Sequence, residues 1–253
     1  MVAKKKTTAV KPKEDQLPAA FAGAEGTGFE GADADSYAIP FLNILQSNSP
    51  AVEDEVEGCK AGLIFNTVTE RPVESCLFIP VSYKRRMVEW VKRDEGGGFC
   101  GEYAMGDPNM PKAVFNEDTG KSETEDGHDL IDTRYHYGIV VYDDGEFEPA
   151  LVTMSSTQLR KSKRWMSLMQ GIKIGGQKAP TFTQAYHLST MKEENEKGKW
   201  RGWVIKHDSQ VTDENIAQAI VDFRQALMDG KVTVDMEQAA GAAGASEDED
   251  DDF

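Results

Sequence analysis

The chain has 253 residues, with 44 acidic and 28 basic side chains, and therefore a formal net charge of −16. Its hydrophobic content of 39% includes 4 Trp, 7 Tyr and 11 Phe, which is enough for a packed core and excludes a wholly disordered chain. No apolar run approaches the roughly 18 residues of a membrane span, and none follows the charged start, so we expect neither a membrane partner nor a secretory signal.

The first part of the chain, residues 1–36, is rich in Ala, Gly, Lys and Asp and has only isolated apolar residues. Such a segment buries too little surface to offset its ordering entropy, so we expect a flexible, lysine-bearing arm. The folded domain is predicted to span residues 37–230. It starts with a dense apolar run and continues with three runs typical of strands, at 62–70, 75–84 and 86–92.

A long acidic connection, residues 96–133, follows these strands and is predicted to be a loop, either functional or disordered. Residues 135–142 and 147–154 then predict a hairpin with an Asp-Gly turn. Ser155 or Ser156 is expected to cap a helix that reaches Gln170, with Gly171 ending it.

A second hairpin is predicted from residues 181–192 and 199–208, and Thr212 is expected to cap an amphipathic helix at 213–228. Residues 231–253 read as a flexible linker and an acidic tail. The order of elements predicts a mainly β fold with one or two helices. The natural candidate is an OB-fold-like antiparallel β-barrel with a flexible N-terminal arm and an acidic C-terminal tail.

The net charge hides an uneven distribution. Residues 151–178 contain no acid and six cations, residues 84–93 carry a net +4, and residues 102–148 carry a net −10. Each basic segment also holds aromatic residues. This combination is typical of single-stranded nucleic-acid binding, because cations neutralise phosphates while exposed rings stack on unpaired bases. The DNA-binding candidates are Tyr83, Lys84, Arg85, Arg86, Trp90, Lys92, Arg93, Arg160, Lys161, Lys163, Arg164, Trp165, Lys173, Lys178, Trp200, Arg201 and Trp203.

A plainer interpretation stands beside this one, because surface Lys and Arg are usually only solvated and Trp usually belongs to the core. In a strand, Tyr83 and Arg85 face one way and Lys84 and Arg86 the other, so these groups cannot all meet one ligand.

The three cysteines and four histidines are scattered, so we expect free thiols, no metal site and no cofactor. No enzyme motif is found either. Residues 171–178 resemble a phosphate-binding loop only superficially, because Gln177 interrupts the Gly-Lys step and Ala179 replaces the hydroxyl. Asp143 and Asp144 lie in a turn, and no catalytic triad is ordered along the chain. The sequence therefore predicts a binding protein without enzymatic activity.

The chain closes on an acidic run that ends in an aromatic residue, and this run is the partner-binding candidate: Glu247, Asp248, Glu249, Asp250, Asp251, Asp252 and Phe253. It resembles the bacteriophage single-stranded-DNA-binding proteins of the replication module, in which an oligonucleotide-binding barrel precedes an acidic tail ending in Phe. Residues 38–52 and 83–99 are also similar to parts of phage-encoded proteins. The long lysine-bearing arm departs from the compact pattern of that family.

The resemblance implies a role in phage DNA replication, recombination or repair, in the cytoplasm of the infected bacterium. It also implies that the tail recruits the phage DNA polymerase and primase-helicase and competes with DNA for the protein's own groove. Two alternatives stay open: an acidic phage interaction protein that inhibits or mimics nucleic acid, and a strand-annealing recombination mediator. The sequence does not fix the oligomeric state, and a homodimer is compatible with it.

Overall fold

The computed structural model describes residues 28, 30, 38–117, 121–196 and 198–236, except for the side chain of Arg93. The chain divides into two compact units, Met1–Asp33 and Ala34–Phe253. Only Gly28 and Glu30 of the first unit are described, so the fold below is that of the second. Most of the expected N-terminal arm and the whole run 247–253 lie outside the described residues.

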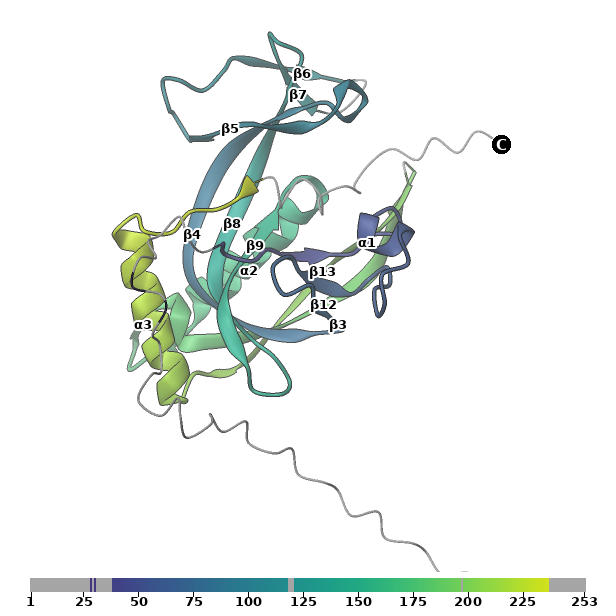
Figure 1. Cartoon of the computed structure of the whole chain (residues 1–253). Helices are drawn as coiled ribbons and strands as arrows, with labels where there is room; N and C mark the ends of the chain where they lie inside the picture. The colour runs from purple at the N-terminus through teal and green to yellow at the C-terminus, as the bar shows by residue number, and fades with distance from the viewer. Residues whose placement is uncertain (1–27, 29, 31–37, 118–120, 197, 237–253) are drawn as a thin grey trace, which may run out of the picture. The chain divides into compact units, whose positions relative to one another are not determined.

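The main sheet has eight antiparallel strands built around a long central pair, β4 (Cys76–Val91) and β8 (Asp129–Val141) (Figure 1). Its order is β13-β12-β4-β8-β7-β6, and β5 pairs with β4 while β9 pairs with β8. The other bounds are β5 Gly98–Ala104, β6 Ala113–Asn116, β7 Lys121–Thr124, β9 Phe147–Met154, β12 Gln184–Asn195 and β13 Gly198–Gln210.

Two small sheets and three helices complete the described fold. The small sheets are β1 (Leu42–Ile44) with β2 (Ile64–Asn66) and β3 (Pro72–Val73), and β10 (Lys173–Ile174) with β11 (Gln177–Lys178). The helices are α1 (Pro50–Glu53), α2 (Leu159–Gly171) and α3 (Glu214–Met228). Short 3-10 turns lie at Arg93–Glu95, Ser156–Gln158 and Thr181–Thr183.

The main sheet separates two hydrophobic cores. Trp165 of α2 packs into one core, and Phe223 of α3 packs into the other. Strand β9 contributes to both, because successive side chains of a strand point to opposite faces: Val152 enters the α2 core and Leu151 the α3 core. The two helices are therefore held against different faces of the same sheet.

The mainly β class is confirmed, as are the two hairpins, which are β8–β9 and β12–β13. Within the described residues the sheet does not close into a barrel, so the OB-like barrel is not what the chain forms. The acidic connection 96–133 is not a loop: β5, β6, β7 and the start of β8 lie in it and extend one end of the central pair (Figure 1).

Three smaller expectations were also wrong. The runs 75–84 and 86–92 form one continuous strand, β4. Neither Ser155 nor Ser156 makes a side-chain cap for the turn and helix that follow. The cap of α3 is Asp213 and not Thr212, because Asp213 Oδ1 accepts hydrogen bonds from the backbone N–H groups of Asn215 and Ile216, at 2.8 and 3.0 Å.

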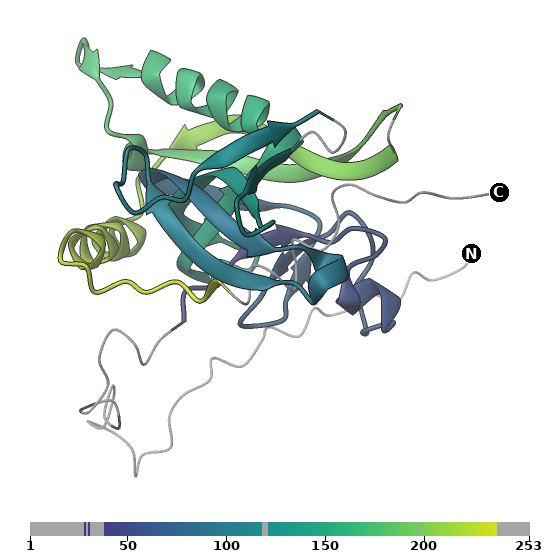
Figure 2. The same ribbon diagram turned by 90° about the horizontal axis from the view of Figure 1, so that it is seen from above.

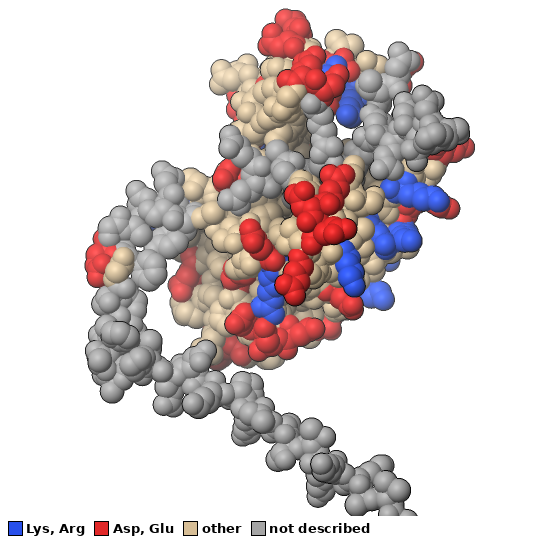
Figure 3. Space-filling view, turned by 45° about the vertical axis from the view of Figure 1, so that its right-hand side comes forward, with Lys and Arg blue, Asp and Glu red and all other residues tan. Residues whose placement is uncertain are grey.

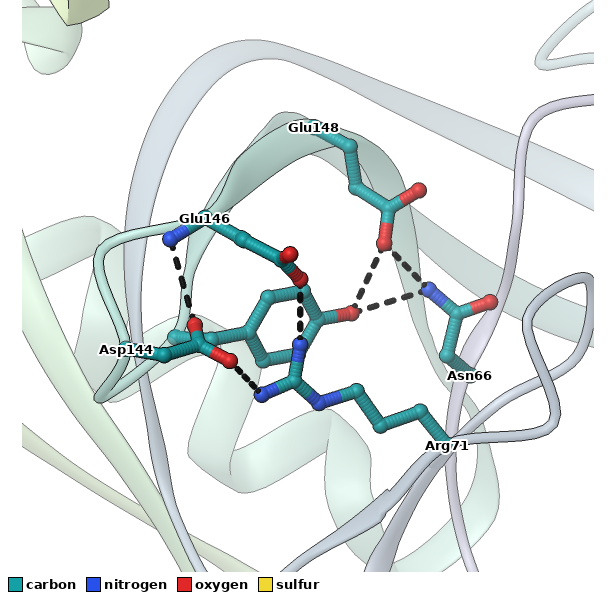
Figure 4. A network of polar contacts seen from close by, with 6 residues as sticks. Asn66, Arg71, Asp144, Glu146 and Glu148 are labelled. Carbon is teal, nitrogen blue, oxygen red and sulfur yellow. Dashed lines mark hydrogen bonds and ion pairs between the residues drawn. The ribbon is translucent and has the colours of Figure 1, made fainter. Parts of the chain in front are cut away.

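A polar network ties the β8–β9 turn to the small β1-β2-β3 sheet (Figure 4). Arg71 donates to Glu146 at 2.8 Å and to Asp144 at 2.5 Å, and its guanidinium lies 4.1 Å from the centre of the Tyr142 ring. The hydrogen bond from Arg71 lowers the pKa of Asp144. Beside them, Asn66 donates to Glu148 at 2.8 Å (Figure 4). Asp144, Glu146 and Glu148 are therefore engaged in structure.

None of the described helices combines the length and the apolar character that crossing a membrane requires. The described thiols are free: Cys59 is half-buried, Cys76 buried and Cys100 exposed.

Candidate nucleic-acid interface

Helix α2 presents the cations of the acid-free segment to solvent. Its buried face consists of Ser162, Trp165 and Met169, which share one stripe of the helix and anchor it to the sheet. The cations project from the remaining surface and from the β10–β11 hairpin that follows. The exposed ones are Arg160, Lys163, Arg164, Lys173 and Lys178. None of these five forms an ion pair with a described residue.

A groove of about 370 Å³ separates α2 from the β12–β13 hairpin, alongside which the helix lies (Figure 2). The basic residues that line it are Arg160, Lys161, Arg164 and Lys206. Its floor offers apolar side chains to solvent, including Leu168 and Met191, which are 38% and 50% exposed. A basic rim over an apolar floor can hold a phosphate backbone at its edge and unpaired bases inside.

One acid lies in this groove and binds two of the candidate residues. Glu193 Oε2 accepts from Lys161 Nζ at 2.7 Å and from Trp200 Nε1 at 2.9 Å. Gly202 makes room for the pair, because a Cβ there would lie 2.2 Å from Lys161 Nζ and 2.3 Å from the carboxylate. Lys161 is thus the one cation of the groove paired with a described acid.

The structure places two of the proposed stacking residues in the core. Trp165 has no exposed surface, and its ring stacks on His136 with centroids 4.6 Å apart. Trp203 is also buried, at 4% exposure. Both rings are unavailable to bases in this conformation, so their assignment as stacking residues is corrected. Trp200, half-buried and held by Glu193, remains beside the groove.

The basic segment of β4 is arranged differently. Tyr83 and Arg85 point to the α2 side of the sheet, where β8 supplies an acid between two arginines. Asp132 accepts two hydrogen bonds from Arg85, at 3.0 and 2.7 Å, and one from Arg134 at 2.8 Å. Arg134 also donates to the Tyr83 hydroxyl at 2.9 Å. These four side chains are linked in one network, in which the buried Arg134 Nε has no described hydrogen-bond partner.

The other cations of this segment are also engaged. Arg86 lies 3.5 Å from a carboxylate oxygen of Glu102 on β5, and Lys92 lies 3.2 Å from Glu123 on β7. Lys84 Nζ lies 5.1 Å from the centre of the Tyr137 ring. The half-buried Trp90 packs edge-on against Phe99, with centroids 5.7 Å apart. Arg93 belongs to a short 3-10 turn, and its side chain lies outside the described part. This segment is a compensated surface and not a free cationic one.

Arg201 lies apart from both sets, on the side of the hairpin that meets the β1–β2 region. Its backbone exchanges two hydrogen bonds with the Gln46 side chain, at 2.7 and 3.0 Å. Its guanidinium lies against Gly62, where an added Cβ would come within 3.1 Å of the guanidinium carbon. The structure therefore does not bring Arg201 into the α2 groove.

His136 lies where the two basic regions meet. Its Nε2 is 2.8 Å from Ser162 Oγ of α2, and its ring centroid is 5.2 Å from that of Tyr83. Burial, helped by the charge of Arg134, lowers the pKa of His136 to about 3. The imidazole is therefore neutral in the folded protein and belongs to the packing beneath α2.

Six of the residues that line the groove were not among the sequence candidates: Leu168, Met191, Glu193, Val204, Ile205 and Lys206. The candidates were chosen as cations and aromatic residues clustered in the sequence, and the apolar and acidic residues of this set do not meet that criterion. The charge of the surface is uneven, as the sequence indicated. Acidic side chains gather over the middle of the face in Figure 3, and basic side chains lie along its right-hand edge.

The fold and this surface define a mainly β protein whose open antiparallel sheet carries a helix with exposed cations that pair with no described acid. Residues 7–233 match the family model described as Pam3 phage gp34-like protein. The chain therefore belongs to the Pam3 phage gp34-like family and is a phage protein. Neither the search of curated proteins nor the search of solved structures returned a match.

Proposed function

We propose that the protein binds single-stranded DNA along α2 and the adjoining groove, as part of a phage replication or recombination system. The observation that carries this proposal is the set of five exposed cations of α2 and the β10–β11 hairpin that form no ion pair with a described residue. Two of them, Arg160 and Arg164, line the groove, which also has exposed apolar side chains. Phosphates release counterions when they meet such cations, so binding is expected to weaken steeply as salt rises.

The acid-rich run 247–253 is proposed to regulate this binding. Its six carboxylates are negatively charged, as DNA phosphates are, and can bind the same α2 cations. The run would in this way compete with DNA for the groove. Phe253 offers an apolar anchor for a partner with a hydrophobic pocket. The proposed partners are the phage DNA polymerase and primase-helicase, in the cytoplasm of the infected host.

Fluorescence anisotropy of a labelled oligo(dT) tests both parts. The full chain should bind at low salt, and deletion of residues 247–253 should tighten binding severalfold. Phe253→Ala should leave DNA affinity unchanged, because it removes no charge. If the full chain and the deletion variant both fail to bind oligo(dT) at low salt, the proposal is wrong. If the full chain and the deletion variant bind oligo(dT) with equal affinity, DNA binding stands and the proposed competition by residues 247–253 is wrong.

A second candidate function, an acidic protein that occupies the nucleic-acid site of another protein, is favoured by the acidic face in Figure 3. The same titration separates the two. A nucleic-acid mimic should show no oligo(dT) binding and should be captured by a basic protein such as a DNA-binding enzyme of the host.

A further inference from the structure

Three potential metal ligands converge in the extension that the acidic connection forms. They are Glu89 near the end of β4, Cys100 in β5 and His128 in the turn before β8. Their ligand atoms all lie within 4.8 Å of one another. His128 Nδ1 is 2.8 Å from Glu89 Oε1 and 3.6 Å from Cys100 Sγ.

Local backbone features aim these side chains at one another. Gly101 pairs with Glu89 and Phe99 pairs with Trp90, so Cys100 is the extra residue of a β-bulge. A bulge redirects a side chain that regular alternation would point away. His128 is fixed by a reciprocal pair: its N–H donates to Thr124 Oγ1 at 3.1 Å, and its carbonyl accepts from Thr124 N–H at 2.9 Å.

The arrangement of Glu89, Cys100 and His128 differs from that of a Cys-His-acid catalytic triad. In a Cys-His-acid relay the thiol and the carboxylate contact opposite nitrogens of the imidazole. Here Cys100 Sγ and Glu89 Oε1 both face Nδ1. In a tetrahedral zinc site with ordinary bond lengths, a sulfur and a nitrogen ligand lie roughly 3.5 Å apart. The observed 3.6 Å separation fits that spacing. The 2.8 Å between His128 Nδ1 and Glu89 Oε1 is a hydrogen-bond distance, so these two atoms would have to separate to about 3.3 Å around a bound ion.

A supporting residue orients the carboxylate. Tyr103 donates its hydroxyl proton to Glu89 Oε2 at 2.9 Å, which leaves Oε1 turned toward His128. Gly101 permits this contact, because a Cβ there would lie 2.9 Å from the Tyr103 hydroxyl. Glu89 is 6% exposed. Tyr103 and His128 are its hydrogen-bond partners, and a bound metal ion would add a full positive charge beside this buried carboxylate.

We propose that Glu89 Oε1, Cys100 Sγ and His128 Nδ1 bind a zinc-type divalent cation. Mixed Cys, His and carboxylate donors are the set that zinc accepts. Three protein ligands leave a fourth position for water, which Cys100 allows because it is exposed. The bound ion would join β5 to β4 and to the start of β8, and so hold the extension together. This inference is independent of DNA binding.

Titration of the full, reduced chain with Co²⁺ tests the site, because only a thiolate ligand gives a sulfur-to-cobalt charge-transfer band. We expect one equivalent of Co²⁺ to produce the band and Zn²⁺ to abolish it by displacement. Cys100→Ser should remove the band. Cys59→Ser, which changes a half-buried thiol elsewhere, should retain it. The acidic tail can bind cations weakly but gives no such band.

A second readout protects the result against misfolding of a variant. Zn²⁺ should raise the thermal midpoint of the full chain and of Cys59→Ser, and should leave that of Cys100→Ser unchanged. Glu89→Gln and His128→Gln should each weaken Co²⁺ affinity at least about tenfold, as expected for loss of one ligand. Absence of the band in the unmodified chain, or an equal band in Cys100→Ser, would overturn the assignment.

Discussion

The two basic segments of this protein look alike in sequence but are used differently in the structure. Residues 84–93 place their described cations against acids or an aromatic ring. Helix α2 exposes Arg160, Lys163 and Arg164 without a described ion pair. The same combination of cations and aromatic residues thus gives paired cations in β4 and, among the described residues, cations without ion pairs in α2.

Secondary structure explains this difference. A strand inside a sheet has neighbours on both edges, and β8 brings Asp132 within reach of Arg85 while β5 brings Glu102 to Arg86. A helix that packs by one stripe keeps the rest of its surface free. A cationic run is therefore a stronger indication of a binding surface on an amphipathic helix than on a central strand.

The largest expected effect comes from removing the unpaired cations. The variant Arg160→Ala/Lys163→Ala/Arg164→Ala should lower oligo(dT) affinity by roughly 100-fold at low salt, and reduce the salt slope by roughly 3, if each side chain meets one phosphate. The measurement is anisotropy at several salt concentrations. A control removes the same charge from exposed positions elsewhere: Lys60→Ala/Lys112→Ala/Arg224→Ala. If the two variants lose affinity equally, the effect is one of net charge only.

Substitutions among the paired side chains of β4 and β8 should lower the stability of the fold and leave DNA binding unchanged. Asp132→Asn leaves Arg85 and the mostly buried Arg134 without their shared charge, so we expect a loss of about 2 kcal/mol in the free energy of unfolding. Urea unfolding measures it, and the exposed Asp143→Asn is the matched control. A drop in DNA affinity of Asp132→Asn at unchanged fold would contradict the separation of the two regions.

A fall in pH should lower the free energy of unfolding through His136, which packs between α2 and the basic segment of β4. Because the pKa of His136 is lowered from 6.5 to about 3, its contribution to stability is complete above pH 6.5 and is lost as the pH falls toward 3. The slope from this group is at most about 1.4 kcal/mol per pH unit. Urea unfolding at several pH values in this range should show a smaller slope for His136→Gln than for the unmodified chain.

The smallest expected effect is a gain. Glu193→Gln removes the acid from the α2 groove and frees Lys161, while the amide oxygen can still accept from Trp200. One extra cation should tighten oligo(dT) binding by about threefold at low salt. Glu194→Gln, an exposed acid next to it in the chain, is the control. Equal gains from both substitutions would mean that only net charge is being measured.

The sequence predicted the elements whose pattern is local. Alternation over residues 147–154 marked β9, and the apolar stripe from Ile216 to Leu227 marked α3. The strands of residues 96–133 were missed because β5 and β6 expose most of their side chains and depend on pairing with β4 and β7. A strand with mostly exposed side chains lacks the alternation of apolar and polar residues by which strands are recognised in a sequence.

The candidate site residues, like the strands, could be predicted only where their pattern is local in the sequence. The cations of α2 were identifiable because residues 151–178 contain no acid. Trp165 was grouped with them in sequence, but helical spacing places it on the buried stripe. The partners that compensate Arg85 and Lys92 lie far along the chain, so only the pairing of the strands reveals them. Glu89, Cys100 and His128 come together for the same reason, through a bulge that no spacing rule indicates.

The central claim is that α2 carries the DNA-binding surface, and the salt dependence of oligo(dT) binding tests it most directly. The unmodified chain should bind with an affinity that falls linearly with salt on logarithmic axes. The variant Arg160→Ala/Lys163→Ala/Arg164→Ala should give a slope smaller by roughly 3, while the Lys60/Lys112/Arg224 control keeps the original slope. An unchanged slope in the α2 variant, or no binding by the unmodified chain at low salt, would contradict the account.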